Sequence, residues 1–580
     1  MGDGKKIDSE QGRGGSSWKR DAWTLAVLLV VFLASRILWI QLQPESVSYW
    51  EEDYRWASAM EILAGPIQPL LDYQADHYQG GSLVVIALLV GSFGLFGESM
   101  LASKAPALLF ASGTLVALFV LCRVFFDRSV ALLAGGLYIA GPPLLAYSSL
   151  LIMGSHGESA LFSALQIFIF LGLLDGRFRT RLGWLGFGFV SGLGIWFCST
   201  SGVSLLACGL TWLLLARTPR PNELGAAVAG GLLGLLPWIA FNLQNDFVGL
   251  MRLFELFGGG DPIDAWEGVS APRKLFLFFA RDLPTGLAVP FAEAMREPWA
   301  TLVKAGLYLP GLAALGLSLA GTIRFLRTRG LRSEPSTLDP ADQRARSEIV
   351  FWVYGALILA VFLGSSFVIQ PDKGAHTYRL FLPAVTLMIV PIASSAARAL
   401  RMSPPLRVLA SALMASFFMA SLSGGIAVAA RKMDEPDRRT ASDHRMRGYV
   451  ARGVLIHRKY EDALDLAFGE ARRVPDLQLR FRVFQGIGWG IQYRYEGSGE
   501  IRALFPPLDE FPQGERVAVL SGLRWTTGER VDELREKVAG GQASPRDVAQ
   551  LERLERLRSA LNARWEQVPL HMRMNDRVIY

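Results

Sequence analysis

The sequence carries little charge and few cysteines. Asp, Glu, Lys and Arg make up only 19% of its 580 residues, against roughly 25% in a soluble domain. The three cysteines, Cys122, Cys198 and Cys208, lie in apolar stretches and lack the spacing of metal ligands. This excludes a disulfide framework and a zinc site, and it indicates that the thiols are buried small hydrophobic groups. The sequence also has no glycine-rich nucleotide-binding loop.

The rest of the chain is strongly apolar. Hydrophobic residues make up 51% of it, and its mean hydropathy is +0.29, which is typical of a multi-pass membrane protein. The formal net charge of +7 is carried mostly by Lys and Arg near the ends of apolar stretches. Charges in these positions determine membrane orientation, so we expect membrane lipids and no nucleic acid among the partners.

The chain begins with a basic segment, 1–21, and an apolar stretch, 22–42. The apolar stretch is too long for the core of a signal peptide, and no small-residue cleavage site follows it. We therefore expect a retained first span with a cytoplasmic N-terminus, in a membrane of the bacterial inner (cell) membrane type.

Hydropathy and flanking charges together predict about 11 transmembrane helices. The predicted spans are 22–42, 99–125, 129–150, 158–175, 182–198, 202–216, 225–243, 303–323, 349–369, 380–397 and 408–429. The stretch 81–96 is short and rich in glycine, and we interpret it as an interfacial or re-entrant helix. With this assignment the arginine-rich short loops face the cytoplasm, as the positive-inside rule requires. The C-terminal region then lies on the outer, extracytoplasmic side.

Residues 431–580 are charged, favour helix and differ in kind from the spans. Apolar segments containing Gly453, Gly486 and Gly522 recur at offsets of 33 and 36 residues, a period typical of stacked helical hairpins such as tetratricopeptide (TPR) repeats. An irregular helical bundle is the alternative. The leucine spacing in 544–564 predicts an amphipathic helix. We thus expect an all-α protein in three parts: a cytoplasmic tail (1–21), a membrane domain (22–430) and a TPR-like helical domain (431–580).

Three adjacent carboxylates, Glu51, Glu52 and Asp53, follow the first predicted span, and 53–64 can form an amphipathic surface helix. Carboxylates this close to a bilayer are costly unless they are solvated or used, so they are default functional candidates. They could act as a general base or hold a divalent cation through oxygen ligands. A solvated acidic loop is the structural alternative.

Three further polar groups are expected on the same outer face. They are Asp76-His77-Tyr78, then His156 with Glu158, and then Lys373, His376, Tyr378 and Arg379. Glu158 could join Glu52 and Asp53 in catalysis or around a cation, or it could simply cap the span that begins there. The basic residues at 373–379 could bind a phosphate, and Arg379 could equally be a snorkelling anchor. His77 and His156 could be interfacial hydrogen-bonding groups without a chemical role.

The order of several short motifs suggests a family. The first two motifs are the acidic residues followed by Tyr54 and Ala57, and His77-Tyr78 before a short surface helix. The next two are Leu101–Ala107, which opens a span, and the turn Arg123–Arg128. The last two are the carboxylate that opens span 158–175 and the stretch Tyr378–Pro383. In this order and membrane placement, roughly residues 20–430 resemble the GT-C membrane glycosyltransferases, specifically those related to protein O-mannosyltransferases and lipid A aminoarabinose transferases. The sequence departs from the family pattern in its Glu-Glu-Asp order, in Glu158 and in Lys104.

The resemblance implies transfer of a sugar from a polyprenyl-phosphate carrier to an acceptor on the outer face. It implies that Glu52 or Asp53 is the catalytic base, with Glu51 still open, that Glu158 is the second acid, and that Arg379 contacts the carrier phosphate. Tyr78 and Tyr378 would lie with their neighbouring histidines at the carrier site. The sugar, the acceptor and any requirement for Mg²⁺ or Mn²⁺ stay open.

Two other functions fit a multi-pass membrane protein. A transporter should show internal repeats among its spans and paired charges at mid-membrane, and the sequence shows neither. A non-catalytic scaffold would use a GT-C-like shell to present 431–580 to a protein partner through a concave helical surface. In an enzyme, the same region could hold an acceptor protein.

Overall fold

The computed structural model contains helices, turns and irregular connections. It describes residues 11–42, 50–74, 79–215, 219–251, 270–289, 298–329, 338–364, 369, 375–432, 441–459, 464–495, 511–540, 543 and 545–569. Within these ranges no strand occurs, so the predicted all-α class is confirmed. The chain forms two compact units: a membrane unit (Met1–Val47, Asp76–Val85, Lys104–Asp437) and a C-terminal unit (Ser48–Ala75, Ile86–Ser103, Arg438–Tyr580).

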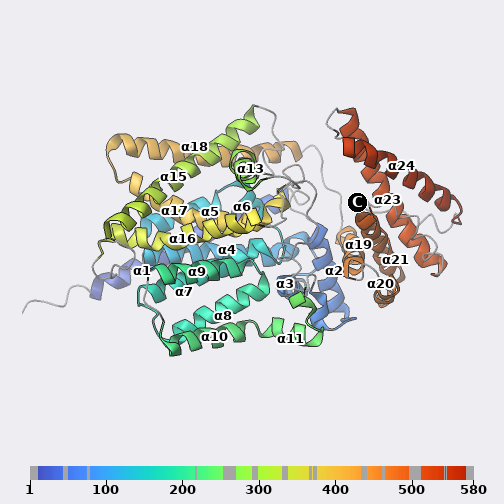
Figure 1. Ribbon diagram of the computed structural model, residues 1–580, viewed down its shortest axis with the longest axis horizontal. Helices are drawn as coiled ribbons and strands as arrows, with labels where there is room; N and C mark the ends of the chain where they lie inside the picture. Colours follow the sequence, from blue (N-terminus) through green and yellow to red (C-terminus); the bar gives the residue numbers. More distant parts are fainter. Residues whose placement is uncertain are drawn as a thin grey trace, which may run out of the picture. The chain divides into compact units, whose positions relative to one another are not determined.

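The membrane unit consists of helices joined by short connections. Its first helices are α1 (Gln11–Leu42), α4 (Met100–Phe125), α5 (Arg128–Ile139), α6 (Pro143–Ser148), α7 (His156–Leu174), α8 (Arg181–Phe197), α9 (Ser201–Leu215), α10 (Pro221–Gly234) and α11 (Leu236–Gln244). Its later helices are α13 (Ala271–Leu277), the π-helix η4 (Phe278–Asp282), α14 (Leu283–Ala288), α15 (Trp299–Arg329), α16 (Pro340–Gly364), the 3-10 helix η8 (Ala375–Phe381), α17 (Leu382–Ala399) and α18 (Pro404–Lys432). Figure 1 shows α9, α16 and α17 running in similar directions, and α16 packs on both of the others.

Six helices in the described ranges are long and apolar enough to cross a membrane: α1, α4, α7, α15, α16 and α17. The bent pair α10 and α11, with 54° between its members, is a seventh if the pair forms one span. The remaining predicted spans coincide with α5 and α6, α8, α9 and α18, and within the described residues the apolar stretches of these helices are shorter than 18 residues. The protein is therefore a multi-pass membrane protein, and the count of eleven spans stays a prediction.

Helix α16 begins at Pro340, nine residues before the start of the predicted span 349–369, because its charged residues are partnered. The Glu348 carboxylate accepts hydrogen bonds from Ser318 and Ser394, each at 2.6 Å, and from Arg398 at 3.1 Å. A carboxylate that is fully buried in this way is tolerated only when it is paired and hydrogen-bonded. Hydropathy alone therefore placed the helix start too late.

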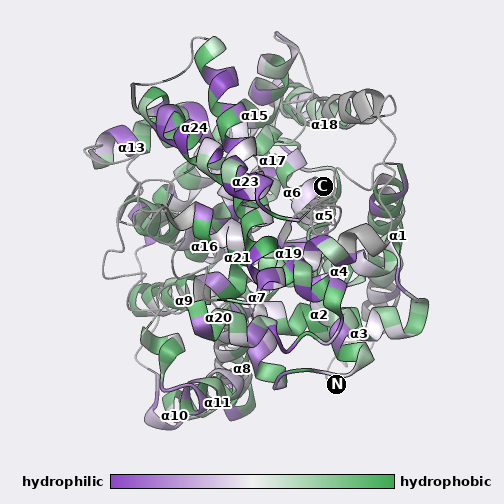
Figure 2. Ribbon diagram, turned by 90° about the vertical axis from the view of Figure 1, so that its right-hand side faces the viewer, coloured by the Kyte–Doolittle hydropathy of each residue, from purple (hydrophilic) through white to green (hydrophobic). Residues whose placement is uncertain are grey.

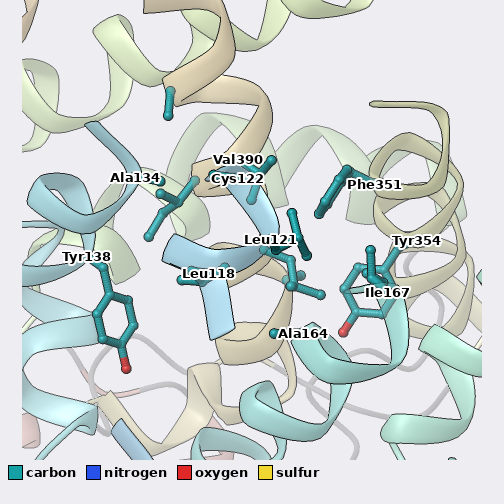
Figure 3. Packing of buried hydrophobic residues seen from close by; sticks show 14 of the residues in the cluster. Leu118, Leu121, Cys122, Ala134, Tyr138, Ala164, Ile167, Phe351, Tyr354 and Val390 are labelled. Carbon is teal, nitrogen blue, oxygen red and sulfur yellow. The ribbon is translucent and has the colours of Figure 1, made fainter. Parts of the chain in front are cut away.

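The core of the membrane unit lies where α4, α5, α7, α16 and α17 meet. Figure 3 shows Leu118 and Cys122 of α4, Ile167 of α7 and Tyr354 of α16 in one group of buried side chains, all of them almost completely removed from solvent. All three cysteines are buried and none is in a disulfide, as their apolar surroundings in the sequence predicted.

Small residues let α8 and α10 pack closely. A Cβ atom at Gly188 or Gly192 of α8, or at Gly230 or Gly234 of α10, would overlap the backbone of the opposite helix. Each helix thus carries two glycines four residues apart on its contact face, which is the arrangement that brings membrane helices together. The C-terminal end of α8 leads directly to Cys198.

The C-terminal unit contains helices from two distant parts of the sequence. They are α2 (Trp50–Ala64), the 3-10 helix η2 (Leu70–Tyr73), part of α3 (Gly81–Phe96), α19 (Ala441–Lys459), α20 (Leu464–Ala471), α21 (Leu477–Tyr495), α23 (Gln513–Ala539) and α24 (Pro545–Glu566). Helices α19, α21, α23 and α24 pack in chain order, as the orange-to-red part of Figure 1 shows. Much of α23 and α24 is coloured hydrophilic in Figure 2, and the predicted amphipathic helix 544–564 corresponds to α24, with Leu554 and Leu561 buried.

The glycines that recur in the sequence lie where these helices cross. A Cβ at Gly453 of α19 would overlap the carbonyl of Val483 in α21, and one at Gly522 of α23 would overlap the carbonyl of Gln485. Gly486 meets α19 in the same way from the α21 side. The offsets of 33 and 36 residues are thus the sequence distances between glycines at corresponding positions of α19, α21 and α23. The assignment of this unit to the TPR class stays a prediction.

Replacing Gly453 by Ala should destabilise the protein by about 1–3 kcal/mol, because a methyl group does not fit a closely packed crossing. The matched control is Gly528→Ala in α23, where a Cβ would have no heavy atom within 4 Å. That change should stabilise the helix by about 0.5–1 kcal/mol. Thermal unfolding of the full-length protein in detergent measures both, and equal effects in the two variants would contradict the crossing assignment.

Candidate functional site

The candidate residues divide between the two units. Glu51, Glu52 and Asp53 lie on α2 in the C-terminal unit, whereas the groups around Glu158 and Arg379 lie in the membrane unit. Some predicted residues lie outside the described residues: Asp76, His77, Tyr78, Asp372, Lys373 and the side chain of His376. The two regions are treated in turn, beginning with the membrane unit.

The Glu158 carboxylate organises the turn that precedes α7. One of its oxygens, Oε1, accepts hydrogen bonds from the backbone N–H groups of Met153 at 2.7 Å and Gly154 at 2.8 Å, and Oε2 accepts one from Ser155 at 3.2 Å. Gly154 has a φ of +58°, a left-handed conformation that glycine adopts without strain. Ionised acceptors at a helix N-terminus satisfy donors that would otherwise be unpaired. This is the capping arrangement that the sequence left open as an alternative to catalysis.

The turn before α7 lies against the start of α3. The backbone N–H of Gly80 donates to the carbonyl of Trp196 at 2.6 Å, and a Cβ at Gly154 would come within 2.7 Å of the Ser82 backbone. A Cβ at Gly81 would overlap the carbonyl of Gly154. Three chain segments, the start of α3, the start of α7 and the end of α8, therefore meet through glycines at one place in the membrane unit.

The fourth predicted polar group reaches the same place. Helix η8 packs against α7, and the half-buried Arg379 guanidinium acts electrostatically on the His156 ring. Nδ1 of His156 lies 3.3 Å from Oγ1 of Thr200 and 3.7 Å from Sγ of Cys198. His156 and Arg379, which lie far apart in the sequence, are thus near enough to interact electrostatically.

Sequence reasoning missed Cys198 and Thr200 as members of this cluster. The available signal was the short polar run at 198–201, where the predicted span 182–198 ends and the span 202–216 follows. Tyr378 was predicted at the site, and its ring is buried against Gly286 of α14, where a Cβ would overlap it. Its ring therefore fixes η8 on α14.

An apolar cavity of about 400 Å³ lies beside η8 in the membrane unit. It is lined mainly by η4, α14, α15, α16, α17 and α18, and the residues of α17 that line it recur along one face from Ala384 to Ala399. This face of α17 extends for about 22 Å at 1.5 Å per residue, which is most of the roughly 30 Å of a bilayer core. The lining is almost wholly apolar, and Phe381 follows Arg379 by two residues. The cavity is thus an apolar space beside the end of the helix η8 that carries Arg379.

In the C-terminal unit, the three adjacent carboxylates of α2 have different surroundings. Glu51 pairs with Arg55 one turn further along the helix, at 3.3 Å, and it is partly exposed. Asp53 pairs with Arg447 of α19, also at 3.3 Å, and it is 2% exposed. Glu52 is equally inaccessible to solvent. The sequence could not distinguish these three residues, whereas the structure assigns Glu51 and Asp53 to separate ion pairs.

A buried network at Glu61 was not predicted. Its carboxylate forms an ion pair with Arg452 of α19 and accepts a hydrogen bond from the Tyr73 hydroxyl. The Tyr449 hydroxyl donates to Glu61 at 3.4 Å. Burial and the neighbouring Glu61 carboxylate raise the pKa of Tyr449 to about 12 and that of Tyr73 above its ordinary value, so both phenols are protonated donors at neutral pH. For Arg452, burial opposes the charge, but the pKa is raised because Glu61 together with Tyr54, Tyr449 and Glu470 more than offsets this effect.

The described residues contain no group of three or more His, Cys, Asp or Glu side chains placed to hold a metal ion. Both oxygens of Glu158, which we considered as a cation ligand together with Glu52 and Asp53, already accept backbone hydrogen bonds. The requirement for Mg²⁺ or Mn²⁺ stays open.

No protein-family model matches the chain, and no curated protein matches it by sequence. Among solved structures it is similar to the oligosaccharyltransferase AglB of the archaeon Archaeoglobus fulgidus. One structure is a complex with an inhibitory peptide and a dolichol-phosphate, with 14% identity, a TM-score of 0.42 and coverage of 78% of this chain and 60% of that one. The other is a complex with Zn and sulfate, with the same identity and TM-score and coverage of 77% and 56%.

The chain thus spans less than two thirds of the length of these neighbours. Neither of the two is described as a protein O-mannosyltransferase or a lipid A aminoarabinose transferase, the families named from the sequence. The resemblance to those families therefore stays an expectation.

Replacing Glu158 by Ala should lower the stability of the protein by about 1–3 kcal/mol, because three backbone donors lose a charged acceptor. Glu158→Gln keeps one oxygen for Met153 and Gly154 and should lose clearly less. Thermal unfolding in detergent compares the two variants. A Gln variant that unfolds like the wild type but has lost activity would instead assign Glu158 to the chemistry.

Proposed function

We propose that the protein is an integral-membrane glycosyltransferase of the GT-C type, which moves a sugar from a polyprenyl-phosphate-linked donor to an acceptor on the outer face of the membrane. The observation that carries the proposal is the apolar cavity that follows one face of α17 and reaches Phe381 at the end of η8, the helix that also carries Arg379. A cation near the end of a long apolar cavity matches a ligand with an anionic head and a hydrocarbon tail.

The tail would gain its binding energy from burial. Each CH₂ group removed from water contributes roughly 0.8 kcal/mol, but a lipid that moves from the bilayer gains less, since its tail is already in an apolar solvent. The polar end must therefore give specificity. Arg379 suits a phosphate because its guanidinium can donate two parallel hydrogen bonds. His156 and Thr200 supply further polar atoms at the start of α7.

The chemistry needs few groups on the donor side. The carrier phosphate leaves as an anion, which Arg379 stabilises without a proton transfer. On the acceptor side a carboxylate removes the proton as the acceptor oxygen attacks the anomeric carbon. We propose this role for Glu52, one of the two acids, Glu52 and Asp53, to which the resemblance to the family points. The resemblance to the family supports an acid at this position in the chain.

Glu158 has a different role in this proposal. Its carboxylate holds the turn at 153–155 by three backbone hydrogen bonds, and this turn carries His156 into the group that includes Thr200. Glu158 thus positions the carrier site without reacting. The proposal also places the protein in a membrane of the bacterial inner type with a cytoplasmic N-terminus, as the sequence suggested. It leaves the identity of the acceptor and of any protein partner open.

Replacing Glu52 by Gln should lower the transfer rate by roughly 10²–10⁴-fold, the usual contribution of a general base. Sugar release from a polyprenyl-phosphate donor in detergent or vesicles measures it. The matched control is Asp465→Asn, an exposed carboxylate of α20, which should have no effect. Full activity in Glu52→Gln contradicts the assignment of the base. A wild type that transfers no sugar but still captures a protein partner would favour the scaffold function.

Filling the cavity should impair carrier binding. Ala396→Phe places a bulky ring in the channel lining, and it should weaken the binding of dolichol-phosphate at least tenfold because the tail loses its space. Ala320→Phe adds the same ring to an exposed position of α15 outside the lining and should bind normally. Arg379→Ala should weaken binding by about 10–100-fold through loss of a charge-assisted hydrogen bond, and Arg379→Lys should weaken it less. Equal binding by all variants would contradict the carrier site.

A further inference from the structure

The apolar cavity of the membrane unit reaches the protein surface on one side. Four of its lining residues are exposed: Leu312, Ala313 and Leu317 of α15, and Ala356 of α16. Leu312 is 37% exposed and Leu317 is 60% exposed. The lining residues from η4, α14, α17 and α18 are all buried or half-buried. Within the described residues, the cavity therefore opens between α15 and α16.

This opening lies in the part of the two helices that a bilayer would cover. Both α15 and α16 are long and apolar enough to cross a membrane, and the four exposed residues lie at least eight residues from the ends of their helices. All four side chains are aliphatic. A hydrocarbon tail that passes here from the bilayer stays in apolar surroundings, whereas a tail that enters from the aqueous side must first be exposed to water.

Helix α15 is attached to its neighbours on either side of the opening. The Tyr308 hydroxyl donates to the carbonyl of Phe279 in η4 at 2.8 Å. Ten residues later, the buried Ser318 hydroxyl donates to the buried Glu348 carboxylate of α16 at 2.6 Å. Between these two attachments, residues 310–315 and 317 line the cavity. The stretch 309–317 can thus move without breaking either contact.

The sequence of this stretch weakens the helix. Pro310 lies inside α15 and has no N–H to donate to the carbonyl of Gly306, four residues earlier. Gly311 and Gly316 follow, and a Cβ at either position would have no heavy atom within 4 Å. Packing therefore does not require these glycines. Because proline and glycine are the least favourable residues in a helix interior, the part of α15 beside the opening has low intrinsic stability.

We propose that the tail of the polyprenyl-phosphate carrier enters and leaves the cavity sideways from the bilayer, between α15 and α16, and that residues 309–317 form a wall that bends to let it pass. The inference rests on the proposed function and adds a route and a moving part to it. The anionic head then stays near η8 while the tail moves within the apolar layer.

Bulky substitutions at the opening test the route. Ala313→Trp and Ala356→Trp each place an indole there, and they should slow both association and dissociation of dolichol-phosphate at least tenfold. The Kd should change less than threefold, because the obstacle lies on the path and not in the place of the bound tail. Transfer of radiolabelled dolichol-phosphate between vesicles and the full-length protein in nanodiscs measures both rates and the Kd.

Each of these variants has a matched control on its own helix. Ala320→Trp in α15 and Ala360→Trp in α16 add the same ring at exposed positions outside the lining, and both should keep the wild-type rates. Wild-type association in Ala313→Trp and in Ala356→Trp would overturn the route. A raised Kd with an unchanged association rate would also overturn it, because these residues would then act only as part of the binding surface.

Stiffening α15 tests the moving wall without adding bulk. Combining Pro310→Ala with Gly311→Ala should slow deuterium exchange at the backbone amides of 309–317 at least tenfold and slow the association of dolichol-phosphate by a similar factor. Gly209→Ala is the control, since Gly209 is an exposed glycine of α9 whose Cβ would also have no heavy atom within 4 Å, and it should change neither quantity. Slower exchange with unchanged association would exclude the bending wall.

Failure of the route and failure of the proposed function give different results. A wild type that binds dolichol-phosphate no better than a phospholipid contradicts the proposed function and the route together. The outcomes in the variants contradict only the route or its wall, because the wild type still binds the carrier in those cases.

Discussion

Partnering of buried charge is the constraint on which the rest of this structure depends. In an apolar interior an unpaired ion costs several kcal/mol, so each buried charged group recruits particular partners. Glu158 accepts hydrogen bonds from three backbone N–H groups and thereby holds the turn before α7. Glu348 recruits two serines and Arg398 and ties α15, α16 and α17 together. Glu61 recruits Arg452 and two tyrosines, which links residues 391 positions apart in the chain.

Close backbone approach is the second organising feature, and glycine makes it possible. The start of α3 meets the start of α7 through Gly81 and Gly154, and α2 meets α19 through Gly448. Successive helices of the C-terminal unit cross at Gly453, Gly486 and Gly522. Because these contacts have no side chain between the backbones, they fix distances more tightly than apolar packing does. The polar groups of each unit are therefore placed by rigid contacts and not by loops alone.

The two candidate regions have complementary chemistry. The membrane unit carries a half-buried guanidinium, Arg379, on η8 and an apolar cavity that the last residue of η8 helps to line, and this combination suits an anionic lipid under the proposed function. The C-terminal unit holds three carboxylates on one helix and distributes them among different partners. In the proposed transfer reaction the first set of groups would stabilise the leaving phosphate, and a carboxylate of the second set would act as the base. The separation of these tasks allows each site to be tested by itself.

The sequence by itself determined features that depend on local patterns: the all-α class, the amphipathic helix α24 and the recurring glycines. It did not show that the predicted spans 129–150 and 225–243 are each broken into two helices. Only the tertiary structure decided that Glu158 caps a turn, that Asp53 pairs with Arg447, and that helices α14–α18 leave a cavity beside the end of η8. The physical reason is that hydropathy and periodicity are properties of neighbouring residues, whereas any of 59 Lys and Arg residues could pair with a given carboxylate until the packing of distant helices selects one.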